Sequence, residues 1–400
     1  MSDAILVVNA GSSSIKFKLY DVEGGALALV FGGAIGGIGS MPTLRVRDGN
    51  GDSLTERRFE AAAVPDASAA QHHLAAWLLE HLGGREIVAV GHRVVHGGPD
   101  FAEPVRVDDA VLRRLESFIP LAPLHQLSNL DPIRVLQQRR PDLPQVACFD
   151  TAFHRGHPEL SDRFALPRHL YDEGVRRYGF HGLSYEYVAG RLREVAPEVA
   201  GARVVIAHLG SGASLCALRE GRSQEATMGF TALDGLPMGT RSGGLDPGVV
   251  LHLIEHKGMA PAEVGHMLYH ESGLLGLSGI SNDVRALLAS DRPEAAMALA
   301  FFCRRAAQAV AGFAVTLGGL DALVFTAGIG ENAPEIRRRI VAALDWAGLI
   351  LRKDSDGTGM ARLDAPGSRA QIWVIPTDEE IMIAKHTMRL LGRTAPGAGA

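Results

Sequence analysis

The chain has 400 residues, more than one hydrophobic core usually supports, so we expect two domains. Its formal net charge of −5 and its scattered Lys and Arg residues exclude the basic stripe typical of nucleic-acid binding. The three cysteines share no metal-binding or redox spacing, the N-terminus lacks a signal-peptide pattern, and no apolar run approaches a membrane span. We therefore expect a cytoplasmic protein with reduced thiols and with no nucleic-acid or membrane partner.

The first predicted element is a hairpin with a tight Gly/Ser loop. Residues 5–8 are apolar, Asn9 and Ala10 follow, residues 11–14 are Gly and Ser, and an alternating run continues to residue 20. Small residues let several backbone N–H groups and hydroxyls point at one anion. Asn9 before the loop and Lys16 after it add an amide and a lysine, an inventory that suits a triphosphate and its metal. A purely structural turn is the alternative.

Between residues 32 and 82 the sequence predicts connections and one helix. The Gly-rich residues 32–39 and the turn-forming residues 48–52 are typical of irregular or hairpin connections. Residues 61–70 are small and polar, which favours a loop leading into a helix at residues 74–82.

A predicted strand at residues 87–90 is followed directly by polar residues. They include His92, Arg93 and His96, placed where α/β proteins usually carry their sites. The planar guanidinium of Arg93 can grip a carboxylate or a phosphoryl group with two hydrogen bonds. For the two histidines, a packed or hydrogen-bonded position in a turn is the alternative to a functional one.

A helix at residues 131–138 and a strand at residues 145–149 follow, and Asp150 comes directly after that strand. Its carboxylate could orient a nucleophile, act as a base or hold a metal, and an Asx turn is the structural alternative. We place the domain boundary near residue 150, which gives domains 1–150 and 151–400, with a C-terminal helix at about residues 380–392 that packs back on the first.

The second half repeats the opening device. Residues 204–218 again form two apolar runs, here around the Gly/Ser loop 208–214, which suggests a duplicated fold with a nucleotide between the halves. His181 precedes this hairpin between glycines, where its imidazole could donate to a migrating phosphoryl oxygen. The long Gly-rich segment 227–247 then carries one cation, Arg241, a natural clamp for phosphoryl oxygens or simply a surface arginine.

The last third combines a helix at residues 294–317, a strand at 322–326 and a Gly loop at 327–332, the third candidate anion site. Asn332 is expected to cap a helix at residues 335–344. A strand at 372–375 leads to a helix at 381–391, with Thr377 and Glu380 as a capping box, which leaves Glu379 for a divalent ion.

Together these segments resemble the acetate kinase, or acetokinase, family of the acetate and sugar kinase, Hsp70 and actin superfamily. The resemblance runs from residues 7–16 to residues 376–380, nearly the whole chain. It implies an α/β fold with two domains of duplicated RNase-H-like, actin-like ATPase fold, with ATP or ADP in the interdomain cleft, Mg²⁺ (alternatively Mn²⁺) and a homodimer. It also implies reversible transfer of the γ-phosphoryl group of ATP to acetate or another short-chain carboxylate.

The resemblance further assigns roles to single residues. Asp150, His181 and Arg241 would be catalytic, and Asn9 and Glu379 would serve the metal. The acid substrate would meet Arg93, His125, Val95, Leu124 and Phe180. The remaining assigned residues would bind the phosphates and the nucleotide: Ser12, Ser14, Lys16, His208, Leu209, Gly210, Ser211, Gly212, Asp283, Val284, Arg285, Gly328, Ile329, Gly330, Glu331 and Asn332.

The chain departs from the family pattern at two positions. Ser211 stands where the family usually has Asn in the second phosphate loop, and a hydroxyl replaces one amide contact but not two. Ala232 stands where the family commonly has the proline of the acyl pocket, so the pocket is expected to accept propionate. Two alternatives therefore stay open: a propionate or butyrate kinase of the same fold, and an actin-like ATP-binding switch that forms no acyl phosphate.

Overall fold

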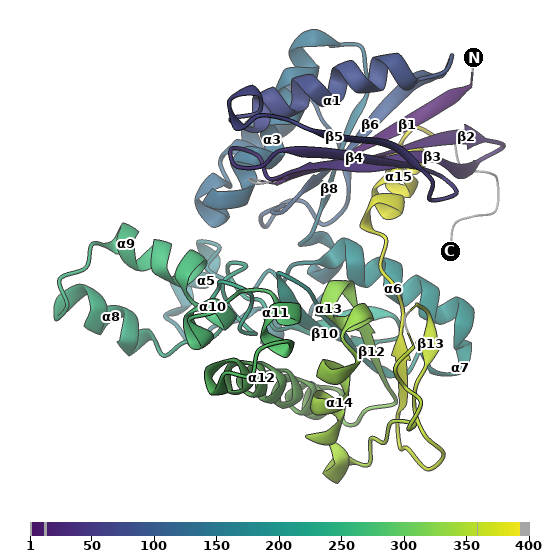
Figure 1. The fold of residues 1–400 in the computed structure, drawn as a ribbon. Helices are drawn as coiled ribbons and strands as arrows, with labels where there is room; N and C mark the ends of the chain where they lie inside the picture. Colours follow the sequence, from purple (N-terminus) through teal and green to yellow (C-terminus); the bar gives the residue numbers. More distant parts are fainter. Residues whose placement is uncertain (1, 12–13, 358, 393–400) are drawn as a thin grey trace. The chain divides into compact units, whose positions relative to one another are not determined.

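The computed structural model describes residues 2–11, 14–357 and 359–392, and its chain divides into two compact units (Figure 1). Unit 1 contains the described residues up to Ala152 together with those from Asp378 onward, and unit 2 extends from Phe153 to Thr377. The two-domain boundary near residue 150 stays a prediction. The C-terminal helix α15 (Glu379–Leu390) belongs to unit 1, where it packs on β1, β6 and β8.

Unit 1 is built on a mixed sheet with its strands in the order β5-β4-β3-β2-β1-β6-β8-β7. The strands β1, β6 and β8 are parallel, and β2 to β5 continue the sheet with antiparallel pairs. The strands are β1 (Asp3–Ala10), β2 (Ser14–Glu23), β3 (Ala26–Gly36), β4 (Thr43–Asp48), β5 (Ser53–Arg58), β6 (Glu86–Val94), β7 (Val105–Arg106) and β8 (Gln145–Phe149).

Unit 2 is built on a second mixed sheet, in the order β11-β10-β9-β12-β14-β13. Its strands are β9 (Arg203–Leu209), β10 (Ala213–Arg219), β11 (Arg222–Ala226), β12 (Ala322–Thr326), β13 (Ala361–Arg362) and β14 (Gln371–Val374). The antiparallel trio β11-β10-β9 and the parallel trio β9-β12-β14 repeat the arrangement of β3-β2-β1 and β1-β6-β8. Each Gly/Ser loop therefore joins the first two strands of its own unit.

The helices bury one face against these sheets. In unit 1, α1 (Ala67–His81) packs on β2, and a cluster of Phe17, Phe31 and Trp77 has ring centroids 5.1–6.3 Å apart. Edge-to-face ring pairs of this kind add to the stability that burial itself supplies. The other helices of unit 1 are α2 (Asp109–Glu116) and α3 (Pro123–Arg139).

In unit 2 the longest helix, α12 (Pro293–Leu317), packs on β9 and β10. By length and composition alone it passes as a membrane span, but its buried side chains belong to the core of unit 2. The other helices are α4 (Glu159–Asp162), α5 (Arg168–Asp172), α6 (Gly182–Val195), α7 (Pro197–Ala200), α8 (Pro247–Glu255), α9 (Pro261–His266), α10 (Gly273–Ser278), α11 (Val284–Leu288), α13 (Ala327–Asn332) and α14 (Pro334–Ala342).

The Gly-rich residues 32–39, predicted as an irregular or hairpin connection, are a connection only in part: residues 37–39 lie in the turn between β3 and β4, whereas residues 32–36 are regular strand. Residues up to Gly36 belong to β3, which pairs with β2 on one side and β4 on the other. A Cβ on Gly33 would collide with the carbonyl oxygen of Arg45, and one on Gly32 would lie 2.9 Å from Lys18 Cγ. The glycines are there because neighbouring strands approach closely, a use of Gly that mimics a loop signal in the sequence.

Both predicted helix caps were also wrong. Asn332 is the last residue of α13, and the N-cap of α14 is Ala333. The predicted Gly loop 327–332 is α13 itself, because the helix starts directly after β12. At the C-terminal helix, Asp378 is the N-cap and accepts a hydrogen bond from Ile381 N (3.0 Å), so Thr377 and Glu380 form no capping box. An aspartate is as good a cap as a threonine, and the sequence alone could not rank two adjacent candidates.

Candidate active-site clusters in the two units

The first group of candidate residues, the Arg93 cluster, lies at the ends of β1, β6 and β8 in unit 1. It consists of Asn9, Arg93, Asp150, Glu379 and Glu380. Arg93 Nε donates to Asp150 Oδ1 (2.8 Å) and Nη2 donates to Asp150 Oδ2 (2.6 Å), a bidentate pair in which the Asp150 side chain is 2% exposed. Because both carboxylate oxygens accept from one planar group, the guanidinium is held in a single orientation.

Arg93 reaches two further members of the cluster. Its Nη1 donates to Asn9 Oδ1 (3.3 Å), and its Nε lies 3.7 Å from Glu379 Oε2. Burial disfavours the charged guanidinium, but the carboxylates of Asp150 and Glu379 together raise the pKa of Arg93. Arginine has five N–H groups, and the hydrogen bonds to Asp150 and Asn9 engage three of them, so the donor inventory leaves two for an anion.

Burial disfavours the ionised forms of the two glutamates in this cluster, Glu379 and Glu380. Burial, assisted by Asp150 and Glu380, raises the pKa of Glu379 to about 7, against the opposing influence of Arg93 and Lys16. For Glu380, burial raises the pKa, but Lys18, Lys16 and a hydrogen bond from Asn9 bring it below its ordinary value. Glu379 thus lies in a position that an additional cation would stabilise in its ionised form.

Sequence reasoning missed three charged residues of this region: Lys18, Asp378 and Glu380. Lys18 Nζ donates to Asp378 Oδ1 (2.7 Å) and lies 3.4 Å from Glu380 Oε2. Alternate residues of a strand point to one face, so Lys16 and Lys18 share a face of β2, and Asn9 is the register partner of Lys16. That two-residue spacing was the available signal, and it was overlooked because only Lys16 lies next to the loop.

The Arg93 cluster also bears on the predicted metal residues, Asn9 and Glu379. Among the described residues, no group of three or more His, Cys, Asp or Glu side chains has the arrangement of a metal site. An amide oxygen and one buried carboxylate are nevertheless hard oxygen donors, and Mg²⁺ typically takes one or two protein carboxylates plus water and phosphate oxygens. The raised pKa of Glu379 fits a buried carboxylate whose ionised form a divalent cation would stabilise.

The second group, the His181 cluster, lies in unit 2. It consists of His181, Ser184, His208, Gly212 and Arg241. His181 is the N-cap of α6 and has a left-handed backbone, with φ of 59°. Such a conformation is uncommon for a residue with a side chain and often marks a functional constraint. His181 Nδ1 is 2.8 Å from Ser214 Oγ, which in turn contacts the Tyr185 hydroxyl. The bond at Nδ1 fixes the orientation of the ring.

The second histidine stacks on the first. The rings of His181 and His208 are 4.1 Å apart with an interplanar angle of 16°. His208 Nδ1 lies 2.8 Å from Ser184 Oγ, which also lies 2.9 Å from Thr377 Oγ1. The sequence did not assign these hydroxyls to the site, because Thr377 was expected only as a helix cap. Ser184 is three residues after His181 on α6, a spacing that places both on one side of the first turn.

Gly212 lies beside the His181 imidazole and the Arg241 guanidinium. A Cβ on Gly212 would lie 3.2 Å from His181 Nε2 and 3.8 Å from Arg241 Nη2. The second Gly/Ser loop therefore lies beside an imidazole and a guanidinium, and a side chain there would fill the space next to both. Arg241 is held by a hydrogen bond from its Nη1 to Ala232 O (2.8 Å).

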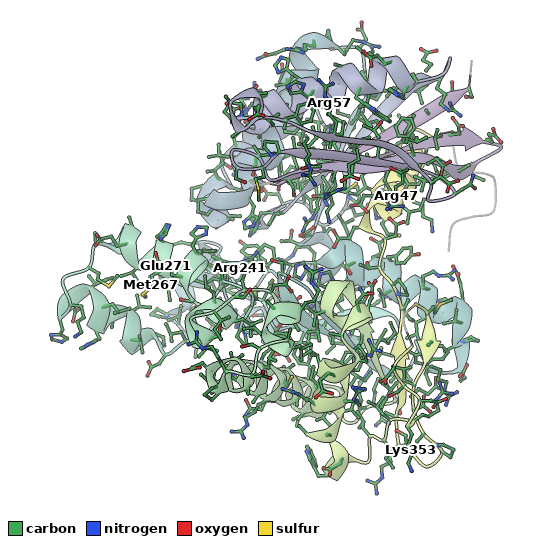
Figure 2. The ribbon with its side chains drawn as sticks, in the orientation of Figure 1. Arg47, Arg57, Arg241, Met267, Glu271 and Lys353 are labelled. Carbon is green, nitrogen blue, oxygen red and sulfur yellow. The ribbon has the colours of Figure 1, made fainter. Side chains whose placement is uncertain are left out.

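The backbone around Arg241 is fixed by the π-helical turn Met267–Glu271. Ser242 N donates to Leu268 O (3.1 Å), and Thr240 Oγ1 donates to Tyr269 O (2.8 Å). Figure 2 labels Arg241 together with Met267 and Glu271, the two ends of this turn. π-helical turns are rare overall, but those that occur are often found at functional sites. The two hydrogen bonds anchor the long segment 227–247 at the point where it carries Arg241.

This anchoring predicts an effect of a distant glycine. Gly273, at the start of α10, has φ of 62°, and a Cβ there would collide with the carbonyl oxygens of Met238 and Arg241. We expect Gly273→Ala to displace Arg241 and to lower kcat by about 10- to 100-fold, as misplaced catalytic groups do. Gly279→Ala is the matched control, because its φ is also 62° but nothing lies within 4 Å. Steady-state kinetics of both variants measure the effect. Equal losses of kcat in the two variants would contradict a displacement of Arg241.

The other predicted nucleotide residues also approach the second Gly/Ser loop. A Cβ on Gly210 would lie 3.9 Å from Gly328 N, at the start of α13, and one on Gly239 would lie 3.3 Å from Asn282 O and 3.6 Å from Ser211 O. Helix α13 and the segment before Asp283 therefore border the loop. Within these segments, Asp283 caps α11 and pairs with Arg285 (2.6 Å), while Val284 is buried.

Some of these side chains already have structural partners. Glu331 Oε1 accepts from Ala327 N (2.8 Å) and Thr377 N (3.1 Å), so it joins α13 to the end of β14. Asn332 Nδ2 donates to Gly328 O (3.0 Å). Gly330 is buried against the backbone of Phe325 and Ala207, and Ile329 lies in the same short helix. For this motif, backbone N–H groups rather than side chains are the groups available to an anion.

The predicted acid-binding residues are placed as follows. Val95 is buried in unit 1, and its N–H donates to Asn129 Oδ1 (2.9 Å). His125 is in the first turn of α3. Phe180 is buried in unit 2 next to His181. The side chain of Leu124 and the whole of Ser12 lie outside the described residues, whereas Leu209 ends β9 and Ser14 begins β2.

Chemically, the two clusters differ. The Arg93 cluster offers a rigid guanidinium for a carboxylate or phosphoryl group beside carboxylates that suit a hard cation. The His181 cluster offers a glycine loop, a helix N-terminus, an oriented imidazole and a second guanidinium, which suit the phosphates of a nucleotide. Such a set is typical of phosphoryl transfer, in which positioning and charge neutralisation dominate.

Comparisons with known proteins agree with this chemistry. The model of the acetokinase family matches residues 4–385. An acetate kinase from Nitrobacter hamburgensis is 55% identical over 390 residues, covering 97% of this chain and 96% of the relative. One from Rhizobium meliloti is 54% identical and covers 99% of this chain and 100% of the relative.

Two solved structures are similar along almost the full length. The acetate kinase of Porphyromonas gingivalis has a TM-score of 0.85 at 35% identity, covering 98% of this chain and 100% of the other. A propionate kinase from Francisella tularensis subsp. tularensis has a TM-score of 0.88 at 36% identity, covering 97% and 100%.

Proposed function

Because this chain belongs to the acetokinase family, with the duplicated actin-like ATPase fold of its structural relatives, we propose that it transfers the γ-phosphoryl group of ATP reversibly to acetate. The products are acetyl phosphate and ADP. The observation that carries the proposal is the Arg93–Asp150 pair, a guanidinium held rigid by two hydrogen bonds with donors left for a carboxylate. An ATP switch without an acid substrate has no need of such a group.

The proposed chemical step is a direct in-line displacement. An acetate oxygen forms a bond to the γ-phosphorus, the bond from that phosphorus to the β,γ-bridging oxygen breaks, and ADP leaves with the electron pair. Acetate is already ionised at pH 7, so no proton has to be removed. Arg93 orients the acetate, and Asp150 orients Arg93. We assign Asp150 this positioning role before any role as a base, because both its oxygens accept from Arg93.

In unit 2, His181 and Arg241 are the proposed stabilisers of the charge on the transferred group, with His125 of unit 1 as the proposed third. The fixed His181 ring presents Nε2, and Arg241 presents Nη2, toward the space beside Gly212. The nucleotide is proposed to bind along residues 208–212, Gly328 and the segment 283–285, and Ser14 and Lys16 are proposed to meet phosphate oxygens from unit 1, with Ser12 as a further candidate.

The divalent cation is proposed to be Mg²⁺, held by Asn9 and Glu379. When bound, it neutralises phosphate charge in the transfer. The contribution of the chain is to present hard oxygen donors and to keep Lys18 paired with Asp378 and Glu380 nearby.

A hydroxamate assay tests the proposed function. The purified protein is mixed with ATP, Mg²⁺ and hydroxylamine, with and without acetate, and acyl hydroxamate and ADP are both measured. We expect hydroxamate that depends on acetate, in one-to-one proportion with ADP. Release of ADP without acetate-dependent hydroxamate would instead support the ATP switch.

The acid pocket is proposed to admit propionate as well, because Ala232 replaces a proline and a similar structure is a propionate kinase. We expect kcat/KM for propionate to be about 10- to 200-fold below that for acetate, the usual worth of one methylene. Ala232→Pro should lower propionate turnover more than acetate turnover. A propionate kcat/KM more than about three orders below acetate would argue against the widened pocket.

We also propose a cytoplasmic homodimer. Cys148, Cys216 and Cys303 are all buried free thiols, which suits a reducing compartment. For the dimer surface the support is α8, an apolar helix of nine residues with none of them buried in unit 2. A second copy of the chain is the proposed cover of this helix, since exposed apolar faces of this kind mark association surfaces.

Light scattering after size-exclusion chromatography tests the surface. Leu251 of α8 is 54% exposed, and Leu251→Glu should shift the protein from dimer to monomer, because it places a charge in the apolar contact. Leu160→Glu, at a leucine that is 88% exposed in α4 of the same unit, should leave the mass unchanged. A Leu251→Glu protein that stays dimeric would remove α8 from the interface.

A further inference from the structure

A cavity in unit 2 lies at the amino ends of the parallel strands, away from the His181 cluster. It has a volume of about 500 Å³, within the range of small-molecule sites. Three of its lining residues precede or begin the parallel strands: Arg203 begins β9, Asp321 precedes β12 and Arg369 precedes β14. The His181 cluster uses the other, carboxyl ends of these strands, at His208 of β9 and in α13, which follows β12.

Strand length separates this cavity from the reaction. At about 3.3 Å per residue, the five steps from Arg203 to His208 span about 17 Å. In α/β sheets, substrates of the main reaction bind at the carboxyl ends of the strands. A ligand in this cavity is therefore distinct from ATP and from acetate.

The wall of the cavity is mainly apolar, with one exposed aromatic ring. Val310 and Ala314 of α12, together with Leu344 and Leu349, supply aliphatic surface. Trp346 also lines the cavity, although its side chain is 72% exposed, and its Nε1 donates to Ala343 O (3.1 Å). A tryptophan ring held by a hydrogen bond at the edge of an apolar cavity offers a flat stacking surface for a planar ligand.

The charged residues that line the cavity leave it with a net positive charge. Arg203 is neutralised by Asp321 through two hydrogen bonds of 2.8 and 2.7 Å, and its Nη1 donates to Gly318 O (2.7 Å). Arg369 differs, because its guanidinium has no hydrogen-bond or ion-pair partner among the described residues. Its stem lies over Gly348, where a Cβ would come within 2.6 Å of Arg369 Cδ. The charged residues lining the cavity are these three, so it carries one uncompensated positive charge.

We propose that this cavity is a second ligand site, selective for a small planar aromatic molecule with one negative charge, such as an aromatic carboxylate. The ring stacks on Trp346 against the aliphatic wall, and the anionic group pairs with Arg369. The inference stands apart from the proposed reaction, because it uses none of the residues assigned to it.

The probe for this site is 8-anilinonaphthalene-1-sulfonate, an aromatic monoanion whose fluorescence rises in apolar surroundings. It is titrated into the full-length protein with saturating ADP, Mg²⁺ and acetate, which occupy the proposed reaction sites. Three variants are compared: Arg369→Glu, Trp346→Ala and the control Arg304→Glu, which makes the same charge change at an exposed position of α12 outside the cavity. Circular dichroism and thermal unfolding confirm that each variant is folded.

We expect one saturable site in the wild type, weakened at least about fivefold by Arg369→Glu and by Trp346→Ala, and changed less than about twofold by Arg304→Glu. Equal affinity in all four proteins would overturn the site. Loss with Trp346→Ala but not with Arg369→Glu would show an apolar patch with no preference for anions, and would overturn the proposed ligand class. In a parallel titration without ADP or acetate, displacement of the probe by added acetate alone would place it in the Arg93 cluster and overturn the site. Failure of the hydroxamate assay leaves these outcomes unaffected.

Discussion

Arg241→Ala is expected to lower kcat by about three orders of magnitude or more, with KM for ATP changed by less than about threefold. Arg241 Nη2 and His181 Nε2 both point to the space beside Gly212, where charge on the transferred phosphoryl group would develop. A contact that strengthens in the transition state affects kcat more than ground-state binding. Initial rates at varied ATP and saturating acetate measure both constants.

Two further variants make this test specific. Arg241→Lys keeps the charge but loses the planar fork, so it should recover only part of kcat. Arg304→Ala removes an exposed arginine of the same unit and should leave both constants unchanged. If Arg241→Ala raised only KM for ATP, Arg241 would be a nucleotide-binding residue and not a clamp on the transferred group.

Asp150→Asn is expected to have the second large effect, a deep loss of kcat accompanied by a rise in KM for acetate. Asn retains one acceptor oxygen, but its NH₂ group faces the guanidinium, so one of the two hydrogen bonds to Arg93 is lost and Arg93 no longer has a fixed orientation. Breaking a buried pair of this kind typically costs about 3–5 kcal/mol, so the variant should also unfold at a lower temperature.

Kinetics and thermal unfolding of the same preparation separate the two effects. Assays are run well below the unfolding transition, and circular dichroism establishes that the variant is native. The control is the ion pair between Asp21 and Arg85 in the same unit (2.8 Å). Asp21→Asn should lower stability without a comparable loss of kcat. Normal turnover of Asp150→Asn would assign Asp150 a purely structural role.

The strands that carry the site were the most predictable part of the fold. Residues 146–149 and 322–325 are apolar and lead directly to the polar residues Asp150 and Thr326, so strand and site candidate were visible together. The structure places β8 and β12 there. The helix caps were not predictable, because Thr377 and Asp378 are adjacent and both can cap α15. Only the geometry of the chain shows that Asp378 does so.

Pairing over long sequence distances was beyond the reach of the sequence. Lys18 and Asp378 are 360 residues apart, and nothing near either residue indicates the other. The orientation of the His181 ring was likewise not predictable, because it depends on a hydrogen bond with Ser214, which lies 33 residues further along the chain in β10. Local motifs therefore indicated which residues belong to the site, whereas the hydrogen bonds that orient them depend on how the sheets are assembled.

The return of the chain to unit 1 at Asp378 has a consequence for biosynthesis. Helix α15 packs on β1, β6 and β8, and a Cβ on Gly91 of β6 would lie within 2.6 Å of Ile383, so the helix docks closely. At about 5 to 20 residues per second, a ribosome needs roughly ten to fifty seconds to reach Asp378 from Ala152. Until then the nascent first unit lacks Glu379 and Glu380 and exposes the apolar strand surface that α15 covers. Most of unit 1 is thus synthesised first, but the unit is complete only when α15 has been made. A chain truncated before Asp378 would therefore be a target for chaperones.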